Sequence, residues 1–82
     1  MIMTEDEAEQ LLSQKRQYDW LTRSDIEFWT VQDIAGKLNV PESTVLGWIK
    51  SKLIEDVVFY TKQTGYRIPR LGLMKYLAST IK

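Results

Sequence analysis

The N-terminal part of the chain has apolar positions at helical spacing. Thr4 followed by Glu7 fits a capping box, in which a hydroxyl and a carboxylate satisfy free backbone amides at the start of a helix. The stripe that follows predicts a helix and is typical of core packing rather than of a binding surface: Ala8, Leu11, Leu12, Lys15 and Tyr18. Residues 22–24 interrupt this pattern. Residues 26–29 then fit either a short extended stretch or one helical turn.

Two short helices are predicted between residues 30 and 53. Thr30 is placed to cap the first helix, and Asn39 tolerates the left-handed backbone that ends a helix. Pro41 suits the first position of the second helix, because its φ angle is already helical. The two apolar stripes are Val31, Ile34, Ala35 and Leu38, and then Val45, Trp48, Ile49 and Leu53. Two such helices, joined by about three or four residues, form a helix-turn-helix.

The pattern after residue 54 is typical of strands. Residues 57–61 and 66–68 are β-branched and aromatic, and residues 62–65 have the length and the glycine of a hairpin loop. Pro69 ends the second strand, and a last helix, expected to cover the sheet, is marked by Leu73, Met74, Leu77 and Ile81. This order predicts a mainly helical α+β fold. It is a winged helix-turn-helix with a two- or three-stranded wing sheet and an extra N-terminal helix.

Length and composition predict one small domain without the residues typical of catalysis or of metal binding. The 82 residues suffice for one compact unit, with residues 1–28 as a helical extension and residues 29–82 as the winged helix-turn-helix. Neither cysteine nor histidine is present, which removes thiol chemistry, the commonest general base and the commonest transition-metal ligand. The four glycines are scattered, so no loop can cradle a phosphate. We expect no catalytic residue, no cofactor and no metal.

The lack of a long apolar run and of a secretory signal predicts a cytoplasmic protein without membrane contact. No apolar run approaches the roughly 20 residues that span a bilayer. The first residues turn acidic at once and lack the basic region of a secretory signal.

The charges are unevenly distributed, although 11 basic and 11 acidic side chains cancel over the whole chain. Residues 1–30 hold 7 acids and 3 bases, whereas residues 31–82 hold 4 acids and 8 bases. A basic half beside an acidic half indicates that only one part meets a polyanion. Charges that merely cover a solvated surface would give the same pattern.

The segment from Thr30 to about Ala78 resembles the excisionase-type and MerR-type DNA-binding domains of bacteria, phages and mobile elements. The resemblance rests on the order and spacing of WTVQDIA at 29–35, LNVPESTV at 38–45 with Trp48 and Ile49, and GYRIPR at 65–70 followed by Leu77. It implies that a recognition helix, about residues 41–52, enters the major groove of duplex DNA. It also implies that the wing, about residues 57–69, lies on the backbone or in the minor groove.

The residues themselves indicate how such a contact would be made. Projected at 100° per residue, the solvent face of the second helix holds Ser43, Gly47, Lys50 and Ser51, flanked by Thr44 and Leu46. Hydroxyls bond phosphates or base edges, a leucine suits a thymine methyl, a glycine permits close approach, and cations neutralise phosphates. The predicted DNA-binding residues are Ser43, Thr44, Leu46, Gly47, Lys50, Lys52, Lys62, Tyr66, Arg67 and Arg70.

Structural interpretations stand beside these functional ones. Tyr66 would pack on the sheet, and Arg67 would pair with Glu55 or Asp56. Trp29 and Trp48 occupy positions where the family packs aromatic side chains in the core.

Two functions of different classes remain open. The first is binding of double-stranded DNA by an accessory or regulatory factor, excisionase-like or in transcription regulation. Its candidate protein partners are a second copy, a recombinase or another phage protein. The second is a winged-helix protein–protein interaction module with little or no DNA affinity, using Leu46 and the acidic N-terminal helix. The neutral total charge favours the second, as does Glu42 where the family often carries arginine.

Overall fold

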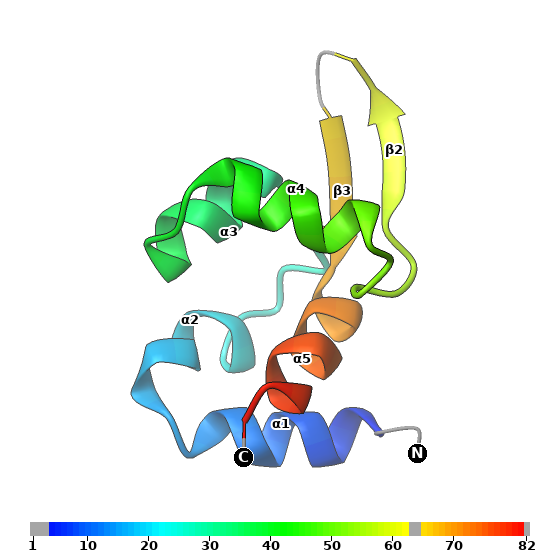
Figure 1. Cartoon of the computed structure of the whole chain (residues 1–82). Coiled ribbons are helices and arrows are strands. Elements are labelled where there is room, and N and C mark those ends of the chain that lie inside the picture. The colour runs from blue at the N-terminus through cyan, green and yellow to red at the C-terminus, as the bar shows by residue number, and fades with distance from the viewer. Residues whose placement is uncertain (1–3, 63–64, 82) are drawn as a thin grey trace.

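The fold is α+β, with helices around a small antiparallel sheet (Figure 1). It is described by a computed structural model that covers residues 4–62 and 65–81, without the side chains of residues 60 and 61. Over these residues the elements are α1 (Glu5–Ser13), the 3₁₀ helix η1 (Arg16–Tyr18), α2 (Asp19–Thr22), β1 (Phe28–Trp29), α3 (Val31–Leu38), α4 (Glu42–Lys50), β2 (Val58–Thr61), β3 (Gly65–Pro69) and α5 (Arg70–Ser79).

The sheet has three antiparallel strands in the order β1-β3-β2. Trp29 of β1 lies opposite Ile68 of β3, so the segment that sequence left open between strand and helix is extended. The β2–β3 hairpin pairs Phe59 with Tyr66, and an irregularity in register follows Phe59. Residues 63 and 64 of the predicted hairpin loop lie outside the described residues.

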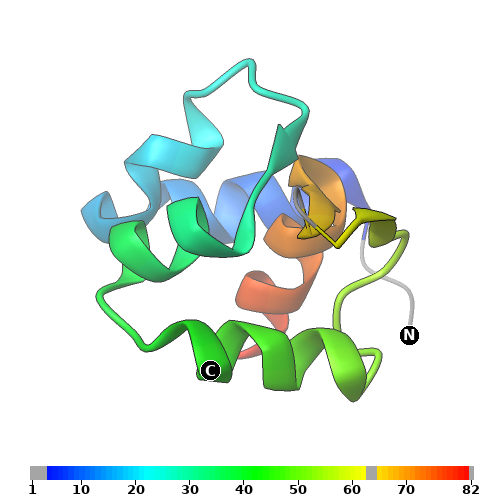
Figure 2. The ribbon, with the colours of Figure 1, turned by 90° about the horizontal axis from the view of Figure 1, so that it is seen from above.

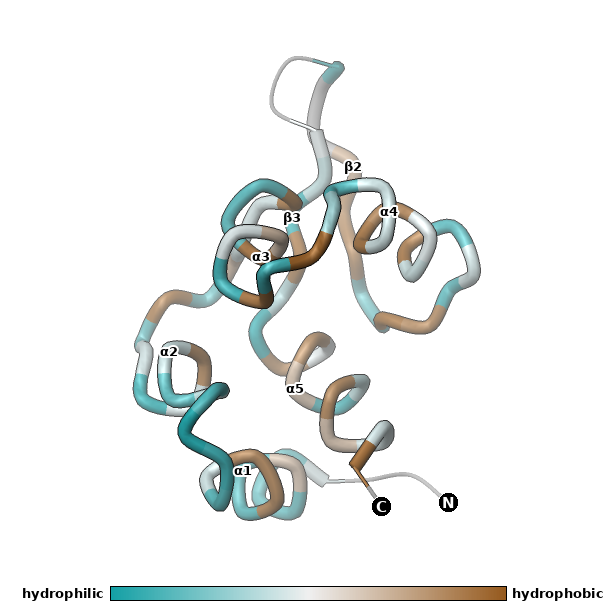
Figure 3. The backbone as a smooth tube through the Cα atoms, turned by 60° about the vertical axis from the view of Figure 1, so that its left-hand side comes forward, coloured by the Kyte–Doolittle hydropathy of each residue, from teal (hydrophilic) through white to brown (hydrophobic). Residues whose placement is uncertain are grey.

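The first helix is shorter than predicted. The Thr4 hydroxyl accepts a hydrogen bond from the Glu7 amide at 3.2 Å, which confirms the hydroxyl half of the predicted capping box. The Glu7 carboxylate accepts from the Thr4 hydroxyl rather than from a backbone amide. However, α1 ends at Ser13, and Lys15 is extended. The polar segment after Leu12, strongly hydrophilic in Figure 3, offers no apolar residue to continue the stripe. After the turn there, Tyr18 of η1 is buried in the core.

The two short helices predicted between residues 30 and 53 form largely as predicted, as α3 and α4. The Thr30 hydroxyl accepts from the Asp33 amide at 3.1 Å, and Asn39 is left-handed with φ 57°. Pro41 is extended and lies one residue before α4 rather than inside it. The second helix was predicted to about residue 52, but α4 ends at Lys50, because Lys52 takes a positive φ of 58°. Leu53 therefore leaves the predicted stripe and is 49% exposed.

One hydrophobic core joins the two ends of the chain. It contains, among others, Ala8 and Leu12 of α1, Ile34 of α3, Val45 of α4 and Leu73 of α5. The last helix was expected to cover the sheet, but it packs mainly against α1 and reaches β3 only near its start (Figure 1). The reason is that α5 is apolar over most of its length and α1 supplies the matching stripe (Figure 3).

Candidate nucleic-acid interface

The outward face of α4 carries the residues predicted to read DNA. Ser43, Gly47 and Lys50 are exposed, whereas Thr44 and Leu46 are half-buried. On the opposite side Val45 is fully buried and anchors the helix to the core. The helical projection made from sequence is therefore confirmed for this face. Glu42, in the first turn, is favoured there by the helix dipole.

The β2–β3 hairpin stands beside α4, and a groove of about 370 Å³ runs between them. From α4 the groove is lined by Glu42 and Leu46, and from the hairpin by Lys62 and Tyr66. The starts of α3 and β3 and the strand β2 complete it with Thr30, Val31, Gln32, Phe59 and Gly65. The structure thus brings Leu46, predicted on the helix, together with Lys62 and Tyr66, predicted on the wing.

An aromatic pair forms the side of the hairpin that faces α4. The rings of Phe59 and Tyr66 meet edge to face with centroids 5.2 Å apart, as expected for cross-strand neighbours. Both rings line the groove at Leu46 and also a second hollow of about 450 Å³ at the end of α4. Tyr66 is half-buried, so it packs on the sheet and still reaches the surface. Phe59 was not among the predicted DNA-binding residues. The signal that could have indicated it is its position opposite Tyr66 in the hairpin register.

Four predicted cations lie on α4, on the turn after it and on the hairpin. Lys50, Lys52, Lys62 and Arg67 are all exposed. Among the residues that the structure describes, the three lysines form no ion pair. Lys52 shares the second hollow with Glu55 and Asp56, so the charge there is mixed.

Arg67 is the residue for which a structural alternative was predicted, namely an ion pair with Glu55 or Asp56. The Glu55 carboxylate forms an ion pair with Lys75 of α5 at 3.8 Å. Arg67 itself lies on β3 opposite Val58, with its side chain exposed. Its place on the hairpin is therefore the one predicted for a wing residue.

Arg70 was predicted to contact DNA, and the structure corrects this. It is the first residue of α5, and its side chain is only 19% exposed. Its Nε donates to the Leu21 carbonyl at 2.9 Å and its Nη2 to the Thr22 carbonyl at 2.8 Å. Its remaining nitrogen lies 3.9 Å from a carboxylate oxygen of Glu5. The guanidinium is therefore turned toward α1 and α2, where it satisfies the carbonyls that end a helix.

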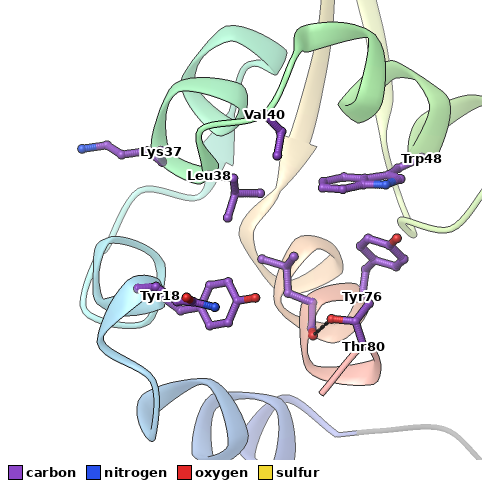
Figure 4. Close-up of a pocket in the computed structure, with 9 residues that line it drawn as sticks. Tyr18, Lys37, Leu38, Val40, Trp48, Tyr76 and Thr80 are labelled. Atoms are coloured by element: carbon purple, nitrogen blue, oxygen red, sulfur yellow. Dashed lines mark hydrogen bonds between the residues drawn. The ribbon is translucent and has the colours of Figure 1, made fainter. Parts of the chain in front are cut away.

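Trp29 and Trp48 are packing residues, as interpreted from sequence. Trp29 is buried and meets Trp20 edge to face at 5.0 Å, which gives a place to the tryptophan that sequence left unplaced. Trp48 is half-buried against Tyr76 of α5, with ring centroids 5.1 Å apart. With Tyr18 and Leu38 among others, these two rings line a cavity of about 300 Å³ behind α4 (Figure 4). None of the predicted DNA-binding residues lines this cavity.

Comparison with known proteins assigns no family. No protein-family model, curated protein or solved structure matches the chain. Among residues 4–62 and 65–81, no helix has the length and apolar character needed to cross a bilayer. Within the same residues, no three acidic side chains gather as a group that could hold a metal ion.

Proposed function

We propose that the protein binds double-stranded DNA as a winged helix-turn-helix of the excisionase or MerR type. In this arrangement α4 enters the major groove, which is about 12 Å wide and admits a helix. The β2–β3 hairpin lies on the adjacent backbone or in the minor groove. The observation that carries the proposal is the groove between α4 and the hairpin, which puts Leu46, Lys62 and Tyr66 on one surface. A role as an accessory or regulatory factor of a phage or mobile element follows from the same resemblance.

Each exposed residue has a role that suits its chemistry. The hydroxyls of Ser43 and Thr44 bond phosphates or base edges, and Leu46 contacts a thymine methyl. Gly47 lets the helix backbone approach the duplex, because a Cβ there would point into open space. The phosphate contacts are assigned to Lys50, Lys52, Lys62, Tyr66 and Arg67. Arg70 is left out, because its guanidinium is bonded to α2.

The distribution of charge supports this orientation. The hairpin with Lys62 projects at one end of the molecule, and α1 lies at the other end (Figure 1). The acidic first turn of α1, with Glu5, Asp6 and Glu7, is therefore remote from the proposed contact. A neutral chain arranged in this way is attracted to a polyanion on one side only.

A salt titration tests the proposal. A mobility shift or an amide NMR titration with a mixed-sequence duplex of about 20 base pairs, at 50 to 200 mM salt, should show affinity that falls steeply. If all four cations contact phosphates, the log–log slope is about −3.6. The NMR shifts should cover residues 42–52 and 58–67. No change on adding duplex at low salt, or shifts confined to residues 4–20, would contradict the proposal.

A protein–protein interaction module is the second candidate. It is favoured by apolar exposure on the hairpin, where Val58 is 48% and Phe59 56% exposed, and by Glu42 in the same groove. A surface of this kind is unusual for a contact made with phosphates alone. The same titration separates the two functions, because this module shows no salt-dependent affinity for the duplex.

A further inference from the structure

A groove of about 400 Å³ lies beside β1, remote from α4. It is formed by the segment before β1, the start of α5 and the start of α1. Figure 2 shows α4 in green and the segment before β1 in cyan at opposite sides of the molecule. The proposed DNA contact therefore leaves this groove uncovered. We call it the β1 groove and describe it by Glu5, Asp25, Ile26, Glu27, Phe28 and Leu71.

Exposed apolar side chains gather in the β1 groove. Ile26 is 48% exposed, Phe28 46% and Leu71 37%. In the part of the chain that the structure describes, these are three of six large hydrophobic side chains with such exposure. Single exposed hydrophobics are ordinary, but three that line one groove are typical of a surface that binds a partner.

The rim of the β1 groove is acidic. Glu5, Asp25 and Glu27 line it, and all three are exposed. Arg70 is the cation of the lining, but its guanidinium is bonded to the carbonyls of α2 and lies 3.9 Å from Glu5. Among the described residues, Asp25 and Glu27 form no ion pair. The groove thus keeps a net negative charge, which excludes nucleic acid and favours a basic partner.

Acidic and apolar residues alternate along the segment that lines the β1 groove. Asp25 and Glu27 are acidic, whereas Ile26 and Phe28 are apolar. Pro69, which is paired opposite Phe28, lines the groove together with Arg70 and Leu71, so the groove reaches the side of β1 that faces β3 and α5. The apolar wall and the acidic rim therefore point to an occupant that alternates in the same way.

We propose that the β1 groove binds an extended segment of a partner protein in which lysine or arginine alternates with apolar residues. The apolar side chains of that segment lie on Ile26, Phe28 and Leu71. Its cations pair with Asp25 and Glu27. The proposal does not depend on DNA binding, because it uses none of the residues of α4 or the hairpin.

The test uses two probe peptides and amide NMR on the full chain. The probes are an eight-residue lysine–valine alternating peptide and its glutamate–valine counterpart. The first should shift the amides of residues 25–28 and 71 and leave residues 42–50 unmoved, and the second should not bind. The double substitution Asp25→Lys with Glu27→Lys should weaken the lysine–valine peptide at least tenfold and admit the glutamate–valine peptide. The matched control, Asp6→Lys with Glu9→Lys, changes the charge equally outside the groove and should leave both results unchanged.

A second variant keeps the test sound if the charge reversal disturbs folding. Ile26→Ser retains every charge and should still weaken the lysine–valine peptide several-fold. Equal binding of both peptides, or binding that neither variant alters, would overturn the proposal. So would shifts of residues 25–28 on raising the protein concentration alone, which would make a second copy the occupant, or on adding duplex DNA.

Discussion

The α1–α5 end of the molecule and the α4–hairpin end use similar residues for opposite purposes. At the α1–α5 end, Arg70 is largely buried, and its Nε and Nη2 donate hydrogen bonds to backbone carbonyls. At the other end, Lys50 and Lys62 are exposed and form no ion pair among the described residues. All these side chains are cations, so charge does not distinguish them. The difference is that Arg70 has backbone carbonyls within reach to bind and is structural, whereas an exposed cation without such carbonyls is available for a ligand.

The glycines divide in the same way. A Cβ on Gly72 of α5 would collide with the backbone carbonyl oxygen of Glu55, so this glycine allows the loop after α4 to pack against α5. A Cβ on Gly47 of α4 would meet nothing within 4 Å. One glycine thus serves internal packing, and the other leaves the outer face of a helix uncovered.

The largest effect is expected at Gly72. Gly72→Ala forces the Glu55 carbonyl to move and should lower the free energy of unfolding by about 2–3 kcal/mol, measured by urea denaturation. Gly36→Ala in α3 is the matched control, because a Cβ there meets open space. It should be neutral or stabilise by up to about 1 kcal/mol. Equal stability of the two variants would show that α5 does not pack closely on this loop.

Arg70→Ala is expected to cost stability rather than DNA affinity. The substitution leaves the Leu21 and Thr22 carbonyls without their donor, and about 2 kcal/mol of unfolding free energy should be lost. The salt slope of DNA binding should stay as in the parent chain, measured at a temperature where the variant is folded. If the log–log salt slope of the variant were shallower by about 0.9, the value for one phosphate contact, Arg70 would belong to the DNA interface.

Lys62→Ala should give the reverse pattern. Its exposed side chain forms no ion pair among the described residues, so the free energy of unfolding should change by less than about 0.5 kcal/mol. The log–log salt slope should become shallower by about 0.9, and affinity should fall on all duplex sequences alike. Lys37→Ala removes the same charge from the end of α3 and should leave the slope unchanged. If both variants act equally, net charge rather than the hairpin contact governs binding.

The smallest effect is expected at Gly47. Gly47→Ala should stabilise the helix by up to about 1 kcal/mol, as Gly36→Ala does in α3. If the helix backbone lies against the duplex, only Gly47→Ala also weakens DNA binding, by a few-fold in the mobility shift. Unchanged affinity would remove Gly47 from the proposed contact and leave the rest of α4 in place.

Features that depend on neighbouring residues were predictable from sequence. Thr4 and Thr30 cap helices and Asn39 takes a left-handed backbone, because each acts within a few residues of the chain. The exposed face of α4 followed from helical geometry alone. The coarse α+β class could be predicted for the same reason.

Features that depend on distant contacts were not predictable. The carbonyls that hold Arg70 lie 48 and 49 residues earlier in the chain, so nothing beside Arg70 marks it as structural. α1 ends at Ser13, and Tyr18 reaches the core from η1 rather than from a continued helix. The groove between α4 and the hairpin depends on how these two elements are placed relative to each other. The pattern of apolar residues within either element does not indicate this placement.

The packing of α1 on α5 also has a consequence for how the chain folds. These helices are separated by nearly the whole sequence, so their packing is of high contact order, which slows folding relative to a bundle of neighbouring helices. On the ribosome α1 emerges before α5. The apolar stripe with Ala8 and Leu12 therefore lacks its contacts with α5 until α5 emerges.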